Sequence, residues 1–160
     1  MKTQYRIAVA ILLLTLFLAI GTYLRWWNLR IPVGQFVVSH WVAIIGGGYL
    51  LVAVPAYAIL KRRTPQHRGA LLKVHVFGNL VAFTLIAIHF ANHLGRVPLP
   101  DLGTGLTAAV VVVIIVATGF LQRFGLMAGQ RTAWRVIHVG LALVLFAVLV
   151  IHALRNFGLL

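Results

Sequence analysis

The chain has 160 residues, of which 62% are hydrophobic and 9% are charged. This composition excludes a soluble domain, because soluble domains carry charged side chains at about a quarter of their positions. Fourteen lysines and arginines stand against a single acid, Asp101, so the formal net charge is +13. The lack of paired carboxylates excludes glycoside hydrolysis and a carboxylate metal cage. The chain has no cysteine, which excludes thiolate metal sites, iron–sulfur clusters and covalent haem attachment.

Five long apolar runs follow one another along the chain, and short gaps that contain proline or glycine separate them. Each run is close to the ~20 residues needed to cross a hydrocarbon core of ~30 Å, where only a helix satisfies its own backbone. The runs predict an all-α integral membrane protein, with five transmembrane helices in a single domain over residues 1–160. The predicted helices are residues 7–24, 36–60, 71–94, 106–121 and 133–156.

The first of these runs has a second interpretation, as a signal peptide that is cleaved. Lys2 and Arg6 precede the apolar stretch, and Ala19-Ile20-Gly21 is a passable small-residue cleavage site. We expect the helix to be retained, and the cleaved leader stays open as the alternative.

The positive charges lie between the apolar runs, which favours a role in membrane orientation over nucleic-acid binding. Ten lysines and arginines fall at the N-terminus and around the second and fourth gaps, and four fall on the other side. Cytoplasmic loops are enriched in these residues, so the N-terminus is predicted inside and the C-terminus outside, in the cytoplasmic membrane of a prokaryote. The inner ten are Lys2, Arg6, Lys61, Arg62, Arg63, Arg68, Lys73, Arg123, Arg131 and Arg135, and the outer four are Arg25, Arg30, Arg96 and Arg155.

Histidine recurs at equal intervals inside the third and fifth runs. His75 and His89 are 14 residues apart in the third run, and His138 and His152 are 14 apart in the fifth. At 100° per residue, a 14-residue step returns to within about 40° of its starting direction, so each pair shares one helix face over ~21 Å. One helix lies between the third and fifth in the chain, so these two run in the same direction. His75 and His138 are therefore predicted at the inner depth, and His89 and His152 at the outer depth.

Four imidazoles in lipid need partners, because an unsatisfied polar group there is costly. A haem iron takes one histidine from each side, so two haems would use all four, whereas zinc would seek further ligands that these helix interiors lack. With no cysteine for thioether bonds, we expect two non-covalent b haems. Any of these histidines taken singly would be more typical of a hydrogen-bonded role between helices.

This four-histidine pattern resembles the di-haem cytochrome b superfamily, whose signature is H-x13-H on two helices separated by one other. Its use of the third and fifth helices is similar to the transmembrane core of ferric reductases and NADPH oxidases. The sequence TGFL at 118–121, followed by W-x3-H ending at His138, resembles the small cytochrome b subunits of hydrogenases and dehydrogenases. The resemblance implies that helices two to five form a haem-binding four-helix bundle. It implies that His75 and His138 ligate the inner haem and that His89 and His152 ligate the outer one.

Small and basic residues near these histidines fit the same interpretation. Gly78 lies three positions after His75 and Gly140 two after His138, where a missing side chain lets a flat macrocycle approach the helix. Gly119 could do the same from the fourth helix, although glycine is also common at ordinary membrane-helix contacts. Two haems bring four propionates, for which arginine and lysine are natural partners. The candidates are Arg68, Lys73, Arg131 and Arg135 on the inner side, and Arg96 and Arg155 on the outer side.

His40 and His93 are expected near the outer end, beside the predicted outer haem. His93 is one turn beyond His89 and could replace it as a ligand, although only His89 reproduces the spacing of the fifth run. Together with Arg96 and Asp101, His40 and His93 form a possible outer-side site for a quinone or an external acceptor. A third haem between His40 and His93 is a further alternative.

Two axial imidazoles leave a haem iron no open position, so electron transfer is the chemistry that such a site permits. The predicted function is electron transfer across the membrane as a subunit or partner of a redox system. The expected partners are a redox protein or a quinone, within membrane lipid. Quinol oxidation, or reduction of ferric ion or oxygen at the outer haem edge, is one alternative, and a haem-free membrane anchor or histidine-lined metal carrier is another. Catalytic residues and the oligomeric state stay open.

Overall fold

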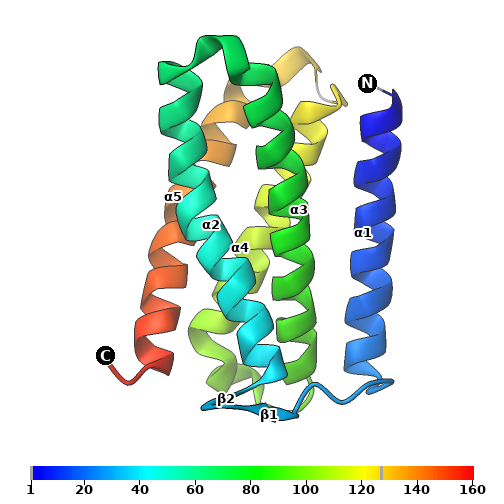
Figure 1. Ribbon diagram of the computed structural model, residues 1–160, viewed down its shortest axis with the longest axis vertical. Helices are drawn as coiled ribbons and strands as arrows, with labels where there is room; N and C mark the ends of the chain where they lie inside the picture. The colour runs from blue at the N-terminus through cyan, green and yellow to red at the C-terminus, as the bar shows by residue number, and fades with distance from the viewer. Residues whose placement is uncertain (1, 127) are drawn as a thin grey trace. The chain divides into compact units, whose positions relative to one another are not determined.

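The computed structural model of the chain is all-α apart from one short hairpin in its described residues (Figure 1). It describes the backbone of residues 2–126 and 128–160, and the side chains of these residues except 99–101, 128 and 131. Two 3₁₀ turns, η1 (Pro65–His67) and η2 (Ala128–Gln130), precede the third and fifth helices. The long helices within this part are α1 (Lys2–Tyr23), α2 (Val38–Arg63), α3 (Arg68–His93), α4 (Leu99–Arg123) and α5 (Arg131–Asn156).

Each of the five predicted apolar runs forms one helix, so this part of the prediction is confirmed. The ends differ most in α4, which begins at Leu99 rather than at residue 106. Pro98 and Pro100 stand at its start, where proline suits the first helical turn. The backbone is not helical at Gly103, with φ 45° and ψ −120°, so the first residues of α4 are kinked away from the rest.

All five helices are long and apolar enough to cross a membrane, with mean hydropathy between 1.9 and 2.6 over the most apolar window of each. Only 6% to 28% of each window is buried, so most of the residues in these windows are at least partly exposed. Large contiguous apolar surfaces are rare on soluble monomers, and lipid would cover them here. Length, composition and exposure are together consistent with a multi-pass membrane protein.

The chain forms two compact units, of which the first comprises Arg6–Arg96. In this unit α2 and α3 form an antiparallel pair joined by Thr64 and η1. The pair approaches closely at Gly46, where an added Cβ would lie 2.9 Å from the carbonyl oxygen of Ala82. A buried hydrogen bond of 2.7 Å between the hydroxyls of Thr15 and Thr84 links α1 to α3. Such hydroxyl contacts are typical of helices that pack against one another in membranes.

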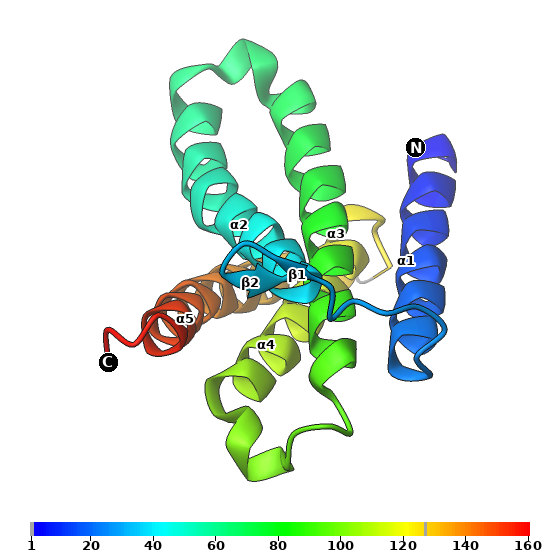
Figure 2. The ribbon, with the colours of Figure 1, turned by 60° about the horizontal axis from the view of Figure 1, so that its bottom comes forward.

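A two-stranded hairpin in the first unit precedes α2 (Figure 2). Its strands, β1 (Pro32–Val33) and β2 (Phe36–Val37), are antiparallel. Gly34 in the turn has φ +63°, a conformation that glycine adopts without steric cost. The Trp41 indole Nε1 donates to the Val33 carbonyl oxygen at 2.9 Å and so ties the hairpin to α2. The sequence predicted a short gap with proline or glycine before this helix but not the pairing of two strands within it.

The second unit comprises Val97–Leu160 together with the first turn of α1. Its main elements are α4 and α5, which form an antiparallel pair connected through Gly125 and η2. Gly125 has φ +73° and so turns the chain directly after the end of α4. The single domain and the four-helix bundle that the sequence predicted stay predictions.

Candidate functional site

In the second unit, His138 and His152 face α4, and a threonine of α4 holds each ring. The Nδ1 atom of His138 lies 3.1 Å from Oγ1 of Thr118, and that of His152 lies 2.9 Å from Oγ1 of Thr104. The two threonines are 14 residues apart, which is also the interval between the two histidines. The same contact is therefore made twice, at two levels about 21 Å apart along the helices.

A glycine follows each of these threonines and gives the imidazole room. A Cβ added at Gly119 would lie 3.0 Å from Cε1 of His138, and one added at Gly105 would lie 3.2 Å from Cε1 of His152. Both distances are shorter than ordinary van der Waals contact, so a larger residue would push the ring away from α4. The sequence predicted that Gly119 admits a macrocycle, and in the structure the group beside Gly119 is the imidazole of His138.

The hydrogen bonds of Thr118 determine the tautomer of His138. The Thr118 hydroxyl donates to the carbonyl oxygen of Ile115 at 3.0 Å, and a hydroxyl has only one proton to donate. Its oxygen therefore accepts from Nδ1–H of His138, and the lone pair of this imidazole is on Nε2. A neutral imidazole held through Nδ1–H, with its lone pair on Nε2, is the form that ligates a metal.

His89, in the first unit, reaches the same tautomer through the backbone. Its Nδ1 lies 2.9 Å from the carbonyl oxygen of Ser39, near the start of α2. A carbonyl oxygen can only accept, so Nδ1 of His89 carries the proton and Nε2 carries the lone pair. His89 and His138 thus carry the ring proton on the same nitrogen, Nδ1.

His75 is held by an aromatic ring and an amide of the first unit. Its ring stacks on Tyr57, with 4.2 Å between centroids and 17° between planes. Its Nδ1 lies 3.2 Å from Nδ2 of Asn79, whose Oδ1 is buried without a hydrogen-bond partner among the described residues. A half-turn of the Asn79 amide would pair Oδ1 with Nδ1–H of His75. That rotamer would give His75 the tautomer found for His89 and His138.

Three histidine rings of the first unit lie together at the C-terminal end of α3. The ring centroid of His40 is 5.7 Å from that of His89 and 5.5 Å from that of His93, and those of His89 and His93 are 4.7 Å apart. The structure thus brings together His40 and His93 of the possible outer-side site, whereas Arg96 lines a pocket that contains no histidine and the side chain of Asp101 lies outside the described residues. Among the described side chains, no group of three or more histidines or acids could hold a metal ion.

The two glycines predicted to admit a macrocycle differ in their surroundings. The Tyr49 hydroxyl lies where a Cβ of Gly78 would be, and it donates to the carbonyl oxygen of Val74 at 3.4 Å. A Cβ added at Gly140 would have no described atom within 4 Å. The α5 surface at Gly140 is therefore open, whereas Tyr49 covers α3 at Gly78.

The basic residues predicted as propionate partners lie at or near the helix ends. Arg68 donates from Nε to the carbonyl oxygen of Lys61 at 3.0 Å and so closes the turn between α2 and α3. Arg96 lines a pocket of the first unit. The side chains of Lys73, Arg135 and Arg155 are exposed, and that of Arg131 lies outside the described residues.

Sequence reasoning missed the residues that orient the four histidines. A signal for two of them was present, because the dipeptide Thr-Gly occurs at 104–105 and again at 118–119, at the interval of the histidines. Ser39 had no such signal, because it acts through a backbone carbonyl that every residue carries. Tyr57 had none either, since its contact with His75 depends on how α2 and α3 pack.

Comparison of the chain with models of known protein families, with curated proteins and with solved structures found no match.

Proposed function

We propose that the chain is a di-haem b-type cytochrome that carries electrons across a membrane. His75 and His138 would ligate an inner haem, and His89 and His152 an outer one. The observation that carries the proposal is the repeated Thr–Gly contact, which holds both histidines of α5 through Nδ1 at an interval of 14 residues. The same interval separates the two histidines of α3, and the pairing of ligands rests on this match in the sequence.

The surroundings of the histidines support a ligand role. A histidine that binds a metal generally donates its other ring N–H to an acceptor, which fixes the ring and raises its basicity as a ligand. Thr118 is this acceptor for His138, and the Ser39 carbonyl is the acceptor for His89. Histidines that only joined two helices would not need the same arrangement twice, with a threonine acceptor and an adjacent glycine at both His138 and His152.

Haem would supply one-electron redox chemistry at these positions. The residues of the chain would hold it through four imidazole Nε2 atoms, orient the α5 rings through Thr104 and Thr118, and exclude water with apolar side chains. Ligation by two histidines would leave the iron no position for a substrate, so exchange of electrons with a partner is the activity that this ligand set favours. That partner would be a redox protein or a quinone, and basic residues near the helix ends would neutralise the propionates.

In the proposed orientation the N-terminus and the turn between α2 and α3 face the cytoplasm, and the C-terminus lies outside. The distribution of lysine and arginine supports this orientation, with ten on one side and four on the other. The cluster of Lys61, Arg62 and Arg63, in which both arginines are exposed, would then be cytoplasmic.

The proposal is tested by the haem-to-protein ratio of the purified chain, measured as the pyridine haemochrome after extraction with acid acetone. We expect two haems per chain, all of them extractable because no cysteine is present. His89→Ala and His152→Ala should each lower the ratio from two to one. His67→Ala removes an exposed imidazole in η1 and should leave the ratio at two. A wild-type ratio near zero would refute the cytochrome, and a ratio near one would refute the two-site pairing.

A second candidate function, quinol oxidation, is favoured by the histidine cluster at the end of α3. Nδ1 of His40 is buried and has no hydrogen-bond partner among the described residues, so it is suited to bind a polar ligand atom. An imidazole there could also take up the proton that a quinol releases as it is oxidised.

His40→Gln tests this second function, because glutamine keeps a polar group but cannot take up the proton. We expect an unchanged haem ratio and quinol-driven reduction slowed by about 10²-fold, the usual effect of losing a general base. His67→Gln is the matched control and should leave the rate unchanged. An unaltered rate in His40→Gln would exclude His40 from quinol oxidation, and loss of haem would identify it as a ligand instead.

A further inference from the structure

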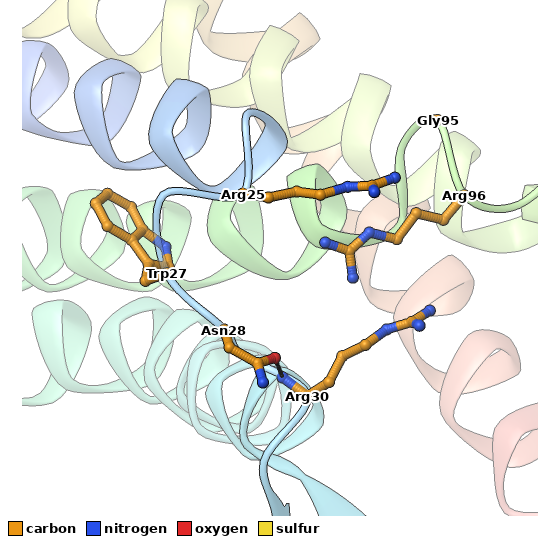
Figure 3. Close-up of a pocket in the computed structure, with 6 residues that line it drawn as sticks. All are labelled: Arg25, Trp27, Asn28, Arg30, Gly95 and Arg96. Carbon is orange, nitrogen blue, oxygen red and sulfur yellow. Dashed lines mark hydrogen bonds between the residues drawn. The ribbon is translucent and has the colours of Figure 1, made fainter.

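The first unit contains a pocket of about 580 Å³ where the segment that follows α1 meets the segment that follows α3. Figure 3 shows the guanidinium groups of Arg25, Arg30 and Arg96 extending into the same space. Asn28 accepts a hydrogen bond from the Arg30 backbone N–H through its Oδ1 at 2.9 Å, so its NH₂ is the group left to donate. The polar side chains of the pocket are therefore hydrogen-bond donors. The lining residues are Arg25, Trp27, Asn28, Arg30, Gly95 and Arg96.

Among the residues whose side chains the structure describes, which do not include Asp101, none brings a negative charge into this pocket. None of the three guanidiniums makes an ion pair or a hydrogen bond with another described side chain or backbone group. Partial burial, together with the charges of Arg30 and Arg25, lowers the pKa of Arg96. Three like charges brought together in this way repel one another unless an anion lies between them.

The backbone conformation at Arg25 favours glycine, so the turn itself does not explain why this residue is an arginine. Arg25 has φ +63°, and the bonds from its N–H to the Thr22 carbonyl and from Trp26 N–H to the Gly21 carbonyl close a Schellman motif after α1. The left-handed position of this motif is usually glycine, as in Gly95, which has φ +73°. An arginine at this position is strained, and strain of this kind is typical of functional sites.

The position of the pocket in the fold indicates which anion it meets. The lining residues follow directly on Tyr23 and His93, where two helices that can span a membrane end. Lipid headgroups lie at that boundary, and Trp26 and Trp27 are residues enriched there. The Trp27 indole donates to the Thr22 hydroxyl at 2.9 Å, which fixes it as a wall of the pocket.

We propose that this pocket binds the phosphate of an anionic phospholipid headgroup. A phosphate offers several oxygens to the planar forks of arginine, and three guanidiniums can surround it. At about 30 Å³ per water molecule, the cavity has the volume of roughly twenty waters, which is enough for a glycerophosphate headgroup and some solvent. Free inorganic phosphate has the same oxyanion chemistry and is the other source to be distinguished. Lipid binding at this pocket does not require haem, so it can be tested independently of the proposed function.

The test measures lipid binding by the full-length chain purified in an uncharged detergent. Phosphatidylglycerol and phosphatidylcholine of equal chain length are titrated separately, and the bound lipid per chain is counted by native mass spectrometry. We expect phosphatidylglycerol to bind about tenfold more tightly than the zwitterionic lipid, as a charge-assisted contact of this kind would give. Inorganic phosphate at the same concentration should not displace it.

Two variants connect the binding to the pocket. Arg25→Gly removes one guanidinium and supplies the residue that its backbone conformation favours, so this variant should fold at least as well as the parent. Arg96→Gln removes a second guanidinium. Each should weaken phosphatidylglycerol binding about tenfold. Arg63→Gln is the matched control: it removes the same charge from the same unit, at the far end of α2, and should leave binding unchanged.

Four results would overturn the proposal. The first is equal binding of the two lipids. The second is a loss of phosphatidylglycerol binding in Arg63→Gln as large as that in Arg25→Gly and Arg96→Gln, which would mean that net charge alone attracts the lipid. The third is displacement by inorganic phosphate, which would make the pocket a site for the free anion. The fourth is unchanged lipid binding in Arg25→Gly and Arg96→Gln with loss of haem, which would assign the arginines to propionates.

Discussion

Thr118 illustrates how one hydroxyl group can select the nitrogen with which a histidine binds a metal. Its proton is committed to the Ile115 carbonyl, so its oxygen accepts from Nδ1–H of His138. The proposed ligand atom, Nε2, is thereby deprotonated before any metal arrives. In the proposed site Thr118 would be a positioning residue, since it would act through His138 and would not itself bind the iron.

Thr118→Val replaces this hydroxyl by a methyl group of nearly the same size. The Nδ1–H of His138 then loses its acceptor. We expect haem affinity at the inner site to fall by about 10- to 100-fold, the usual effect of removing a hydrogen-bond partner of a metal-ligating histidine. The midpoint potential of that haem should also shift, because the basicity of its ligand changes. Affinity is measured by transfer of haem to excess apomyoglobin, and the potential by redox titration.

Two further substitutions on α4 sharpen this prediction. Thr107→Val is the matched control, because the Thr107 side chain is exposed and its hydroxyl reaches only the Gly103 carbonyl, at 3.4 Å. Thr118→Ser restores the acceptor and should recover most of the affinity. Wild-type affinity and potential in Thr118→Val would show that the hydrogen bond does not position a haem ligand.

At the scale of the helices, the sequence was sufficient to predict that each apolar run forms one helix. A run of about 20 apolar residues has one way to satisfy its backbone in lipid, so its helical state does not depend on its neighbours. The helix α4 begins seven residues before the predicted run, because the turn from Leu99 to the kink at Gly103 is outside the apolar stretch by which the run was defined. The hairpin of β1 and β2 was missed, since two-residue strands are too short to show an alternating pattern.

The candidate site was predictable in its histidines and not in most of its supporting residues. The 14-residue interval places His75 with His89, and His138 with His152, on common helix faces, and that is a property of each helix alone. The acceptor for His89 is a backbone carbonyl of α2, and the choice of that carbonyl depends on how α2 packs against α3. The type of residue at such a backbone contact does not indicate how the two helices pack.

The packing of α1 leads to a prediction about the N-terminus of the protein. The Thr15 and Thr84 hydroxyls share a buried hydrogen bond of 2.7 Å, and Trp26 and Trp27 cover Gly21, so that the Ala19-Ile20-Gly21 segment lies in a packed helix. A signal peptidase needs an extended and accessible segment at its cleavage site. We therefore expect α1 to be retained in the purified protein.

Intact-mass measurement of the chain, expressed in a bacterium that has signal peptidase, tests this retention. The mass should include residues before Gly21. Thr84→Val should weaken the packing of α1 against α3 by about 0.6 kcal/mol, the average for hydrogen bonds between membrane helices. The melting temperature should fall slightly, and the segment should stay protected from cleavage. A mature chain that begins at Thr22 would contradict the prediction and identify the first run as a leader.

On the scale of the whole molecule, the charge of +13 means that most counter-charges must come from other molecules. One acid cannot neutralise fourteen basic side chains, so three kinds of anion are relevant. Haem propionates would meet basic residues near the helix ends, lipid phosphate would meet the pocket of Arg25, Arg30 and Arg96, and an acidic protein would meet Lys61, Arg62 and Arg63. The first two would bind stably, whereas contact with a soluble protein would be transient and strongly dependent on salt.

The exposed side chains of Arg62 and Arg63 allow the third of these contacts to be tested. Reduced flavodoxin, an acidic one-electron donor, should reduce the inner haem quickly at low salt, because opposite charges accelerate encounter. Raising the ionic strength from 0.01 M to 0.1 M shortens the Debye length from about 30 Å to about 10 Å and should slow the reaction. Reduction of the double variant Arg62→Glu/Arg63→Glu by flavodoxin should be slow at low salt and nearly insensitive to added salt.

A neutral quinol analogue is the control donor, because it approaches through the membrane and should reduce parent and variant at equal rates. If stopped-flow spectroscopy instead shows the same flavodoxin rate in parent and variant at every salt concentration, these arginines serve membrane orientation and not partner docking.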